Sequence, residues 1–270
     1  MRLAVIGAGA VGRSVVELAG EHGHEVVAVA DSSTAVVADG TGGPGADDSA
    51  GVDPDAVVAR KAERGIVGDD DPDDALAADY DVLVEATPTT LGDAEPGFSH
   101  VTTALERDRH AVLANKGPVA ERYGDLRAAV ADSDGEIRFE ATVGGAIPAV
   151  STVEDIEPGH VTAVRGVLNG TANFILTRMA AEGLDYDHVL AEAQDLGVAE
   201  ADPSFDVDGT DAALKCVILA NVLSFGAADD PADAREFTLA DADVSGIRDV
   251  PGSALRLAAE DGQTVRLIGE

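Results

Sequence analysis

The stretch Gly7-Ala8-Gly9-Ala10-Val11-Gly12 decides the fold of the N-terminal half of this 270-residue chain. A short apolar run at residues 3–6 precedes it, and residues 11–21 carry apolar side chains at helical spacing. A second apolar run at residues 25–30 follows and ends at Asp31. The order strand, turn, helix, strand is a βαβ unit. Glycines at this spacing in that context are typical of a turn that binds the pyrophosphate of a dinucleotide.

Each position of the turn has a physical role in such binding. Gly7 allows the tight turn, Gly9 lets the backbone approach the pyrophosphate, and Gly12 permits close packing of the helix on the strand. Ala10 and Val11 begin the helix, whose free N–H groups and partial positive charge favour phosphate. The alternative, a purely structural glycine-rich turn, does not require the strand and helix that flank it here.

Asp31 stands where a carboxylate commonly binds the ribose 2′-hydroxyl of the cofactor. A carboxylate at this position repels a 2′-phosphate, and Ser32, Ser33 and Thr34 follow it instead of an arginine. We therefore expect NAD to be preferred over NADP. The alternative is a solvated aspartate at the end of a strand.

Strands and helices continue to alternate as far as residue 131. Apolar runs at residues 81–86 and 111–114 predict buried strands, and the patterns at residues 54–64 and 97–107 predict helices. The Gly-, Asp- and Pro-rich residues 39–54 predict a surface loop. The alternation predicts an α/β fold in which residues 1–131 form a doubly wound parallel sheet of the Rossmann type.

The pattern changes beyond residue 131. Strands are expected at residues 137–143 and 161–168, and three helices at residues 170–182, 187–196 and 210–223. Asn169 is expected to cap the first of these helices. Residues 132–270 are therefore predicted to form a second, α+β domain.

Composition bears on partners and location. The chain has 51 acidic and 18 basic residues, and its net charge of −33 repels nucleic acid and anionic membranes. The acids are spread along the chain, which favours adaptation to high salt over an acidic partner-binding surface. Residues 212–225, the most apolar stretch, are too few to span a membrane, and no secretory signal is visible, so we expect a cytoplasmic protein. A single cysteine, Cys216, excludes an internal disulfide.

Acidic residues crowd the loop before the helix at residues 210–223. Glu200, Asp206 and Asp211 precede Lys215. Asp211 and Lys215 are four residues apart, so they share one face of the helix. An ammonium beside carboxylates at the mouth of an apolar helix suits proton donation to a substrate oxygen. The same spacing fits an ordinary surface ion pair equally well. Lysine is rare in this chain, which directs attention to the three that occur: Lys61, Lys116 and Lys215.

This segment resembles homoserine dehydrogenases, whose signature is G-x-x-E-x-D-P-x-x-D-x-x-G-x-D-x-x-x-K. The signature runs here from Gly197 to Lys215 without a gap. Asn115-Lys116 and residues 140–148 and 169–176 are also similar to the family, so the resemblance covers most of residues 1–225.

The resemblance implies reversible NAD(P)H-dependent reduction of L-aspartate 4-semialdehyde to L-homoserine, a step of threonine and methionine biosynthesis. Lys215 would be the acid/base that protonates the aldehyde oxygen, and Lys116 would lie between nicotinamide and substrate. Thr87 would lie against the cofactor. The second domain would bind substrate and form a homodimer through its sheet. The substrate-binding carboxylates implied are Glu200, Asp206 and Asp211.

The family also implies a monovalent cation, usually sodium, on a glycine-rich turn that offers carbonyl oxygens. The alternative for this segment is a simple tight turn. Family members continue with a strand and a glycine-rich return segment, which we expect to be missing after Glu270. The implied cation ligands are Glu140, Val143, Gly145 and Ile147.

Two other functions remain open. Aspartate-semialdehyde dehydrogenase uses the same aldehyde but needs a cysteine nucleophile, and Cys216 lies in an apolar helix where a buried structural thiol is expected. A non-catalytic NAD-binding sensor on the same fold would have no need of Lys215.

Overall fold

The computed structural model describes residues 1–38, 51–228 and 230–270, which form two compact units, Met1–Ile147 and Pro148–Glu270. Most of the loop predicted at residues 39–54 lies outside the described residues. The division falls after Ile147 and not after residue 131, because the segment Ile137–Arg138 adds a strand to the sheet of the first unit.

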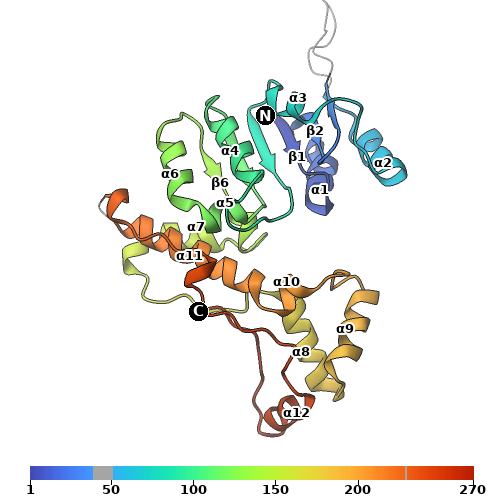
Figure 1. Cartoon of the computed structure of the whole chain (residues 1–270), viewed down its shortest axis with the longest axis vertical. Helices are drawn as coiled ribbons and strands as arrows, with labels where there is room; N and C mark the ends of the chain where they lie inside the picture. The colour runs from blue at the N-terminus through green and yellow to red at the C-terminus, as the bar shows by residue number, and fades with distance from the viewer. Residues whose placement is uncertain (39–50, 229) are drawn as a thin grey trace, which may run out of the picture. The chain divides into compact units, whose positions relative to one another are not determined.

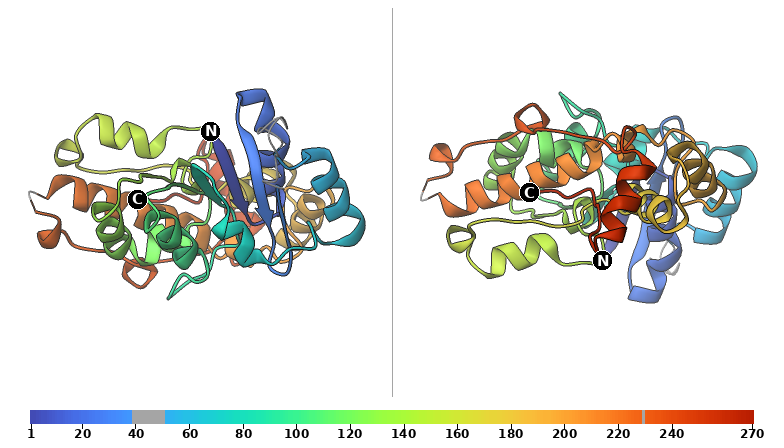
Figure 2. Two further views of the ribbon diagram at one scale, coloured as in Figure 1. Left: turned by 90° about the horizontal axis from the view of Figure 1, so that it is seen from above. Right: turned by 90° about the horizontal axis from the view of Figure 1, so that it is seen from below.

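The first unit is built on one six-stranded sheet, seen in Figure 1 and from two further directions in Figure 2. The strand order is β3-β2-β1-β4-β5-β6, and all neighbours pair in parallel except β2 with β3. This arrangement confirms the predicted Rossmann-type sheet. The strands are β1 (Arg2–Ile6), β2 (Glu25–Ala30), β3 (Ala35–Val37), β4 (Val82–Glu85), β5 (His110–Leu113) and β6 (Ile137–Arg138).

Helices cover both faces of this sheet. Helix α1 (Ala10–Leu18) joins β1 to β2, and α4 (Gly97–Leu105) joins β4 to β5, in the opposite direction across the sheet. Right-handed crossovers that step in opposite directions place their helices on opposite faces. The other helical segments are η1 (Gly20–His22), α2 (Pro54–Arg64), α3 (Pro72–Ala77), α5 (Gly117–Glu121), α6 (Tyr123–Ala131) and η2 (Glu140–Thr142).

The strand order reverses between β1 and β4, and this reversal locates a binding crevice. In open α/β sheets, ligands bind outside the carboxyl ends of the strands at such a switch point. The predicted glycine turn follows β1, and the loop that begins at Ala86 follows β4. The fold therefore brings the turn and the loop that contains Thr87 to the same edge of the sheet.

The second unit is mostly helical. Residues from α8, α9 and α12 form its core, including Ile175, Met179, Val189 and Leu255. Asn169 caps α8 as predicted, because its Oδ1 accepts a hydrogen bond from the backbone N of Ala172 at 2.8 Å. The elements are α7 (Ala149–Asp155), η3 (Pro158–His160), α8 (Gly170–Glu182), α9 (Tyr186–Asp195), α10 (Ser204–Val207), α11 (Thr210–Ala227), η4 (Pro231–Asp233), η5 (Leu239–Asp241) and α12 (Gly252–Glu260).

One predicted strand is too long, and another is absent. The strand predicted at residues 137–143 stops after two residues, because the chain turns into η2 and the carbonyl oxygen of Glu140 accepts N–H groups that follow it. Residues 161–168 are not a strand. Their one β-bridge in the described part of the chain pairs Gly166 with Gly269, by N···O contacts of 3.0 and 2.9 Å. A strand needs a partner along several residues, and this run has one at a single position.

Within the described ranges, α11 alone is long and apolar enough to cross a membrane by length and composition. Core helices share these properties. Leu214, Ile218 and Asn221 of α11 are fully buried, and the helix packs against α7 and α10 of its own unit.

Candidate active site

The glycine turn after β1 has one glycine that faces open space and two that packing requires. Gly7 has a φ of +105°, and a Cβ there would overlap the backbone of Ala86. A Cβ on Gly12 would overlap the carbonyl oxygen of Gly7. Gly9, the N-cap of α1, has nothing within 4 Å of the place of a Cβ. Backbone that is open at a helix N-terminus is where a pyrophosphate fits.

Ala10 and Val11, the first residues of α1, are exposed at the same place. Their backbone N–H groups belong to the first turn of the helix, where no intrahelical acceptor is available. The residues present therefore fit a bound dinucleotide phosphate.

Asp31 is not a solvated carboxylate. Its side chain is 7% exposed, its Oδ1 accepts the N–H groups of Ser33 and Thr34 at 2.8 Å, and its Oδ2 accepts from Lys61 Nζ at 2.8 Å. Burial raises the pKa of this carboxyl, but the hydrogen bonds from Lys61, Ser33 and Thr34 outweigh burial and lower the pKa to about 2. Lys61 comes from α2 and also donates to the carbonyl oxygen of Gly65 at 2.8 Å. Sequence reasoning noted Lys61 as rare but did not find this contact.

The loops after β4 and β5 meet beside the glycine turn. The backbone N of Thr87 lies 2.6 Å from the place of a Cβ on Gly7. The backbone N of Lys116 donates to Thr89 Oγ1 at 3.2 Å. Thr87 and Lys116 therefore belong to one loop cluster at the carboxyl edge of the sheet.

A buried carboxylate that sequence reasoning missed joins these two loops. Glu85, the last residue of β4, is fully buried. Its Oε1 accepts the N–H of Thr87 at 3.0 Å and Asn115 Nδ2 at 3.3 Å, and its Oε2 contacts His100 Nδ1 at 2.7 Å. Glu85 could have been found from the sequence as an acidic residue at the end of an apolar strand, because such a residue needs hydrogen-bond partners when it is buried.

In the second unit, Lys215 lies in a cluster of charged and amide side chains. Its Nζ donates to Asp211 Oδ2 at 2.8 Å and to the carbonyl oxygen of Leu168 at 2.7 Å. The Lys215 and Asp211 side chains are 15% and 8% exposed, so this pair is not an ordinary surface ion pair. Asn169 Nδ2 donates to Asp206 Oδ1 at 2.7 Å and to Asp211 Oδ2 at 2.9 Å. The structure thus brings together Asp206, Asp211 and Lys215 and adds Asn169, which sequence reasoning treated only as a helix cap.

No hydrogen bond or ion pair seen in the described residues joins the Glu200 side chain to Asn169, Asp206, Asp211 or Lys215. It is exposed in the loop between α9 and α10, and its carbonyl oxygen accepts Gln194 Nε2 at 3.0 Å. Lys116 belongs to the first unit and Lys215 to the second.

The turn that is expected to hold a cation is compact. The carbonyl oxygen of Glu140 accepts the N–H groups of Val143, Gly144 and Gly145 at 3.1–3.3 Å. The expected ligands there, which include Ile147, offer oxygen atoms, and hard monovalent and divalent cations prefer oxygen. Within residues 1–38, 51–228 and 230–270, no three His, Cys, Asp or Glu side chains gather as a metal site. The oxygen donors of these expected ligands are their backbone carbonyls and the Glu140 carboxylate.

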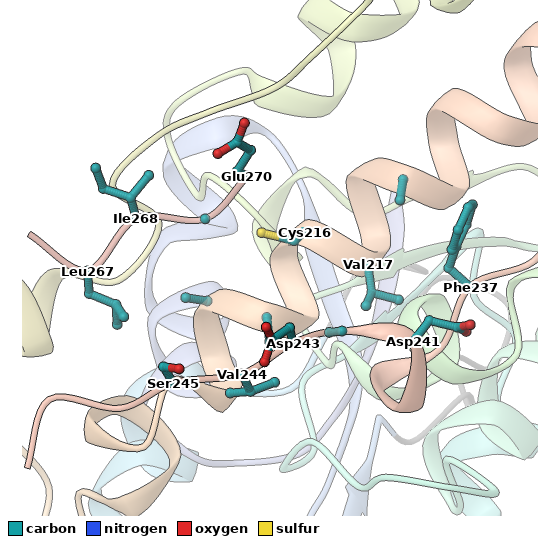
Figure 3. Close-up of a pocket in the computed structure, with 16 residues that line it drawn as sticks. Cys216, Val217, Phe237, Asp241, Asp243, Val244, Ser245, Leu267, Ile268 and Glu270 are labelled. Atoms are coloured by element: carbon teal, nitrogen blue, oxygen red, sulfur yellow. The ribbon is translucent and has the colours of Figure 1, made fainter.

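A pocket of about 260 Å³ lies along α11 at Cys216 (Figure 3). The sulfur of Cys216 points toward the segment with Leu267, Ile268 and Glu270, and Lys215 is not among the lining residues. Burial raises the pKa of the Cys216 thiol, against the opposing effect of a hydrogen bond from the backbone of Glu270. Because the thiolate is the nucleophilic form, this cysteine is poorly suited to attack an aldehyde.

Two family models match most of the chain. The model described as homoserine dehydrogenase matches residues 148–270, and the model described as the homoserine dehydrogenase NAD-binding domain matches residues 7–140. The chain belongs to the homoserine dehydrogenase family. Membership confirms the resemblance drawn from the segment ending at Lys215 and makes the chain an NAD(P)-dependent oxidoreductase.

Similar members of the homoserine dehydrogenase family support this assignment. Homoserine dehydrogenase of Methanocaldococcus jannaschii is 33% identical over all of this chain and 80% of its own length. The crystal structure of a putative homoserine dehydrogenase from Archaeoglobus fulgidus is 35% identical, with a TM-score of 0.81 over 99% of this chain and 79% of that one. A hyperthermophilic archaeal homoserine dehydrogenase in complex with NADPH is 25% identical, with a TM-score of 0.73 over 93% of this chain and 75% of that one.

Proposed function

We propose that this chain catalyses the reversible NAD(P)H-dependent reduction of L-aspartate 4-semialdehyde to L-homoserine, in threonine and methionine biosynthesis. The observation that carries the proposal is the setting of Lys215. The largely buried Lys215 ammonium donates to Asp211 and to the carbonyl oxygen of Leu168, and the carboxylate of Asp206 lies in the same cluster. The chain that carries this cluster belongs to a family of dehydrogenases.

The bound nicotinamide supplies the hydride that reduces the aldehyde carbon. As the carbonyl carbon is reduced, its oxygen gains negative charge and needs a proton. An ammonium has three N–H donors, and Lys215 uses two of them on Asp211 and on Leu168 in the described structure. The third N–H is left to donate to the aldehyde oxygen, and the proton moves from Nζ to that oxygen. In the reverse direction the neutral amine removes the hydroxyl proton of homoserine.

Both the aldehyde and the alcohol carry an α-ammonium group. Asp206, Asp211 and Lys215 together have a formal charge of −1, so this cluster attracts a cation. We infer that Asp206 and Asp211 bind the α-ammonium, with Glu200 as a further ligand. Lys116 is inferred to polarise the same aldehyde oxygen from the dinucleotide-binding unit.

The cofactor site combines the glycine turn with Thr87 and Asp31. A carboxylate that stays ionised down to a pH of about 2 favours the ribose 2′-hydroxyl over a 2′-phosphate, so we infer a preference for NAD. Lys61 neutralises part of that charge, which makes the expected discrimination against NADP moderate. The NADPH complex of the hyperthermophilic archaeal relative shows that the fold also accepts the phosphorylated cofactor.

We also infer that a sodium ion binds the turn with Glu140, Val143, Gly145 and Ile147. Its positive charge would hold the carbonyl oxygens of the turn together and so stabilise the folded state. Sodium chloride should then raise the melting temperature more than choline chloride at equal ionic strength. Identical melting curves would refute the site.

Several broader properties are proposed on composition and family. We infer a homodimer in the cytoplasm, adapted to high salt, that acts on a small molecule and has no nucleic-acid or membrane partner. Light scattering of the purified chain at high salt tests the dimer, and a monomer at micromolar concentration would exclude it.

The test of the activity is NADH oxidation with L-aspartate 4-semialdehyde at high salt. Lys215→Ala should lower kcat by roughly 10²–10⁴-fold while NADH still binds, because proton transfer is lost and the dinucleotide site is intact. Cys216→Ser should retain most of the activity. Loss of turnover in Cys216→Ser would favour aspartate-semialdehyde dehydrogenase, and NADH binding without turnover in the unmodified chain would favour the sensor.

A further inference from the structure

We propose that Asn169 is a positioning residue of the active site, which holds the carboxylates of Asp206 and Asp211 side by side. This inference rests on the proposed function, because it concerns the carboxylates that bind substrate and orient Lys215. It assigns to Asn169 a task beyond capping α8.

Both N–H donors of one amide are directed at two carboxylates. Asn169 Nδ2 is 2.7 Å from Asp206 Oδ1 and 2.9 Å from Asp211 Oδ2, so these oxygens are at most about 5.6 Å apart. Two ionised carboxylates this close repel each other unless donors lie between them. Asn169 is 3% exposed, so water has little access to replace its amide.

The contact with Asp211 extends to Lys215. Asp211 Oδ2 accepts from Asn169 Nδ2 and also from Lys215 Nζ, at 2.9 and 2.8 Å. The preceding carbonyl, of Leu168, accepts from the same Nζ. Residues 168 and 169 therefore contact all three charged side chains of the cluster, and they limit the directions in which Lys215 can present its remaining N–H.

The other polar atoms of Asn169 anchor it to α8. Oδ1 accepts the N–H of Ala172, and the main-chain carbonyl oxygen accepts Asn173 Nδ2 at 2.9 Å. Helix α8 contributes Ile175, Leu176 and Met179 to the core of the unit, so this anchor is part of a buried helix. The amide is thus fixed by a buried helix on one side and aimed at two carboxylates on the other.

Two substitutions separate capping from positioning. Serine and aspartate are both good N-caps, so Asn169→Ser and Asn169→Asp should each retain the start of α8. Serine lacks the two donors. Aspartate has nearly the shape of asparagine but places a third carboxylate against Asp206 and Asp211. A residue that only caps the helix would tolerate aspartate at least as well as serine.

The experiment measures homoserine oxidation and melting temperature in the full chain at high salt. We expect Asn169→Ser to lower kcat/KM for homoserine about 10- to 100-fold, by analogy with the loss of side chains that orient metal ligands. Asn169→Asp should lose more than Asn169→Ser. The KM for NAD should stay within about twofold of the wild-type value in both variants.

A matched control is Asp53→Ser, the same kind of change at the N-cap of α2, where Asp53 Oδ1 accepts two backbone N–H groups. This control should keep the kcat/KM for homoserine. The proposal is overturned if Asn169→Ser and Asn169→Asp retain wild-type kcat/KM, if aspartate is tolerated better than serine, or if activity falls only in proportion to folded protein. A wild-type chain that does not oxidise homoserine would instead refute the proposed function.

Discussion

The buried carboxylate of Asp31 should make the stability of the dinucleotide-binding unit depend on pH in a narrow acidic range. The perturbation is Asp31→Asn, which removes the charge with little change in shape. In the folded chain the pKa of Asp31 is about 2, against an ordinary value of 3.8. The folded state therefore holds the ionised form more firmly than the unfolded state does.

The size of the effect follows from this difference in pKa. A lowered pKa contributes stability that is complete above the unfolded value of 3.8 and is lost as the pH falls through about 2. At about 1.4 kcal/mol per pKa unit, the contribution is at most about 2.5 kcal/mol. Salt screens the contact with Lys61, so we expect about 1–2 kcal/mol under the conditions of the assay.

The assay is urea unfolding of the wild-type and Asp31→Asn chains between pH 2 and pH 6 at fixed ionic strength. The difference in their free energies of unfolding should shrink by about 1–2 kcal/mol from pH 5 to pH 2, because at pH 2 nearly all of the unfolded Asp31 and about half of the folded Asp31 are protonated. In a Lys61→Met background the same substitution should give a smaller pH-dependent change, because the cation is gone. A difference that stays constant with pH would refute the assigned ion pair.

Three further outcomes test the cofactor site and the charge of the chain. In thermal unfolding, Gly12→Ala should destabilise the fold by roughly 1–3 kcal/mol, because its Cβ would overlap the Gly7 carbonyl oxygen. Gly9→Ala should melt like wild type, because its Cβ meets open space, but it should bind NADH more weakly in a fluorescence titration. Equal effects of the two substitutions on folding would contradict this packing. Steady-state kinetics should give a lower KM for NADH than for NADPH, and Asp31→Ser should reduce that preference. Lowering KCl from about 2 M to about 0.1 M should lower the melting temperature, because the net charge of −33 is then poorly screened. An unchanged melting temperature would argue against salt adaptation.

Sequence reasoning identified best those features that neighbours along the chain define. The glycine turn is defined by the strand before it and the helix after it, and Asp211 and Lys215 are neighbours on one helix. The contact of Lys61 with Asp31 spans 30 residues, and that of Asn169 with Asp206 spans 37. Such contacts depend on how helices and loops pack, and local pattern carries no information on that.

The two strand errors have a related cause. An apolar or alternating run shows that a segment suits extended backbone, but not that a partner lies beside it. Residues 161–168 form one bridge and no ladder, whereas Ile137–Arg138 pairs with β5 and so joins the first unit. Predicting the division of the chain required knowledge of strand pairing, which a single sequence does not contain.

The bridge between Gly166 and Gly269 makes the last residues of the described chain part of the support for Lys215. The same segment exchanges two further hydrogen bonds with α8, because the backbone N and O of Leu267 bond to the Asn173 side chain, each at 3.0 Å. Arg165 and Glu270 form an ion pair at its end. The segment therefore lies against residues 166–168, whose last carbonyl accepts a hydrogen bond from Lys215 Nζ. Slow hydrogen exchange at the amides of Gly166, Leu267 and Gly269 would show that the surroundings of Lys215, some 50 residues away in sequence, are held rigidly.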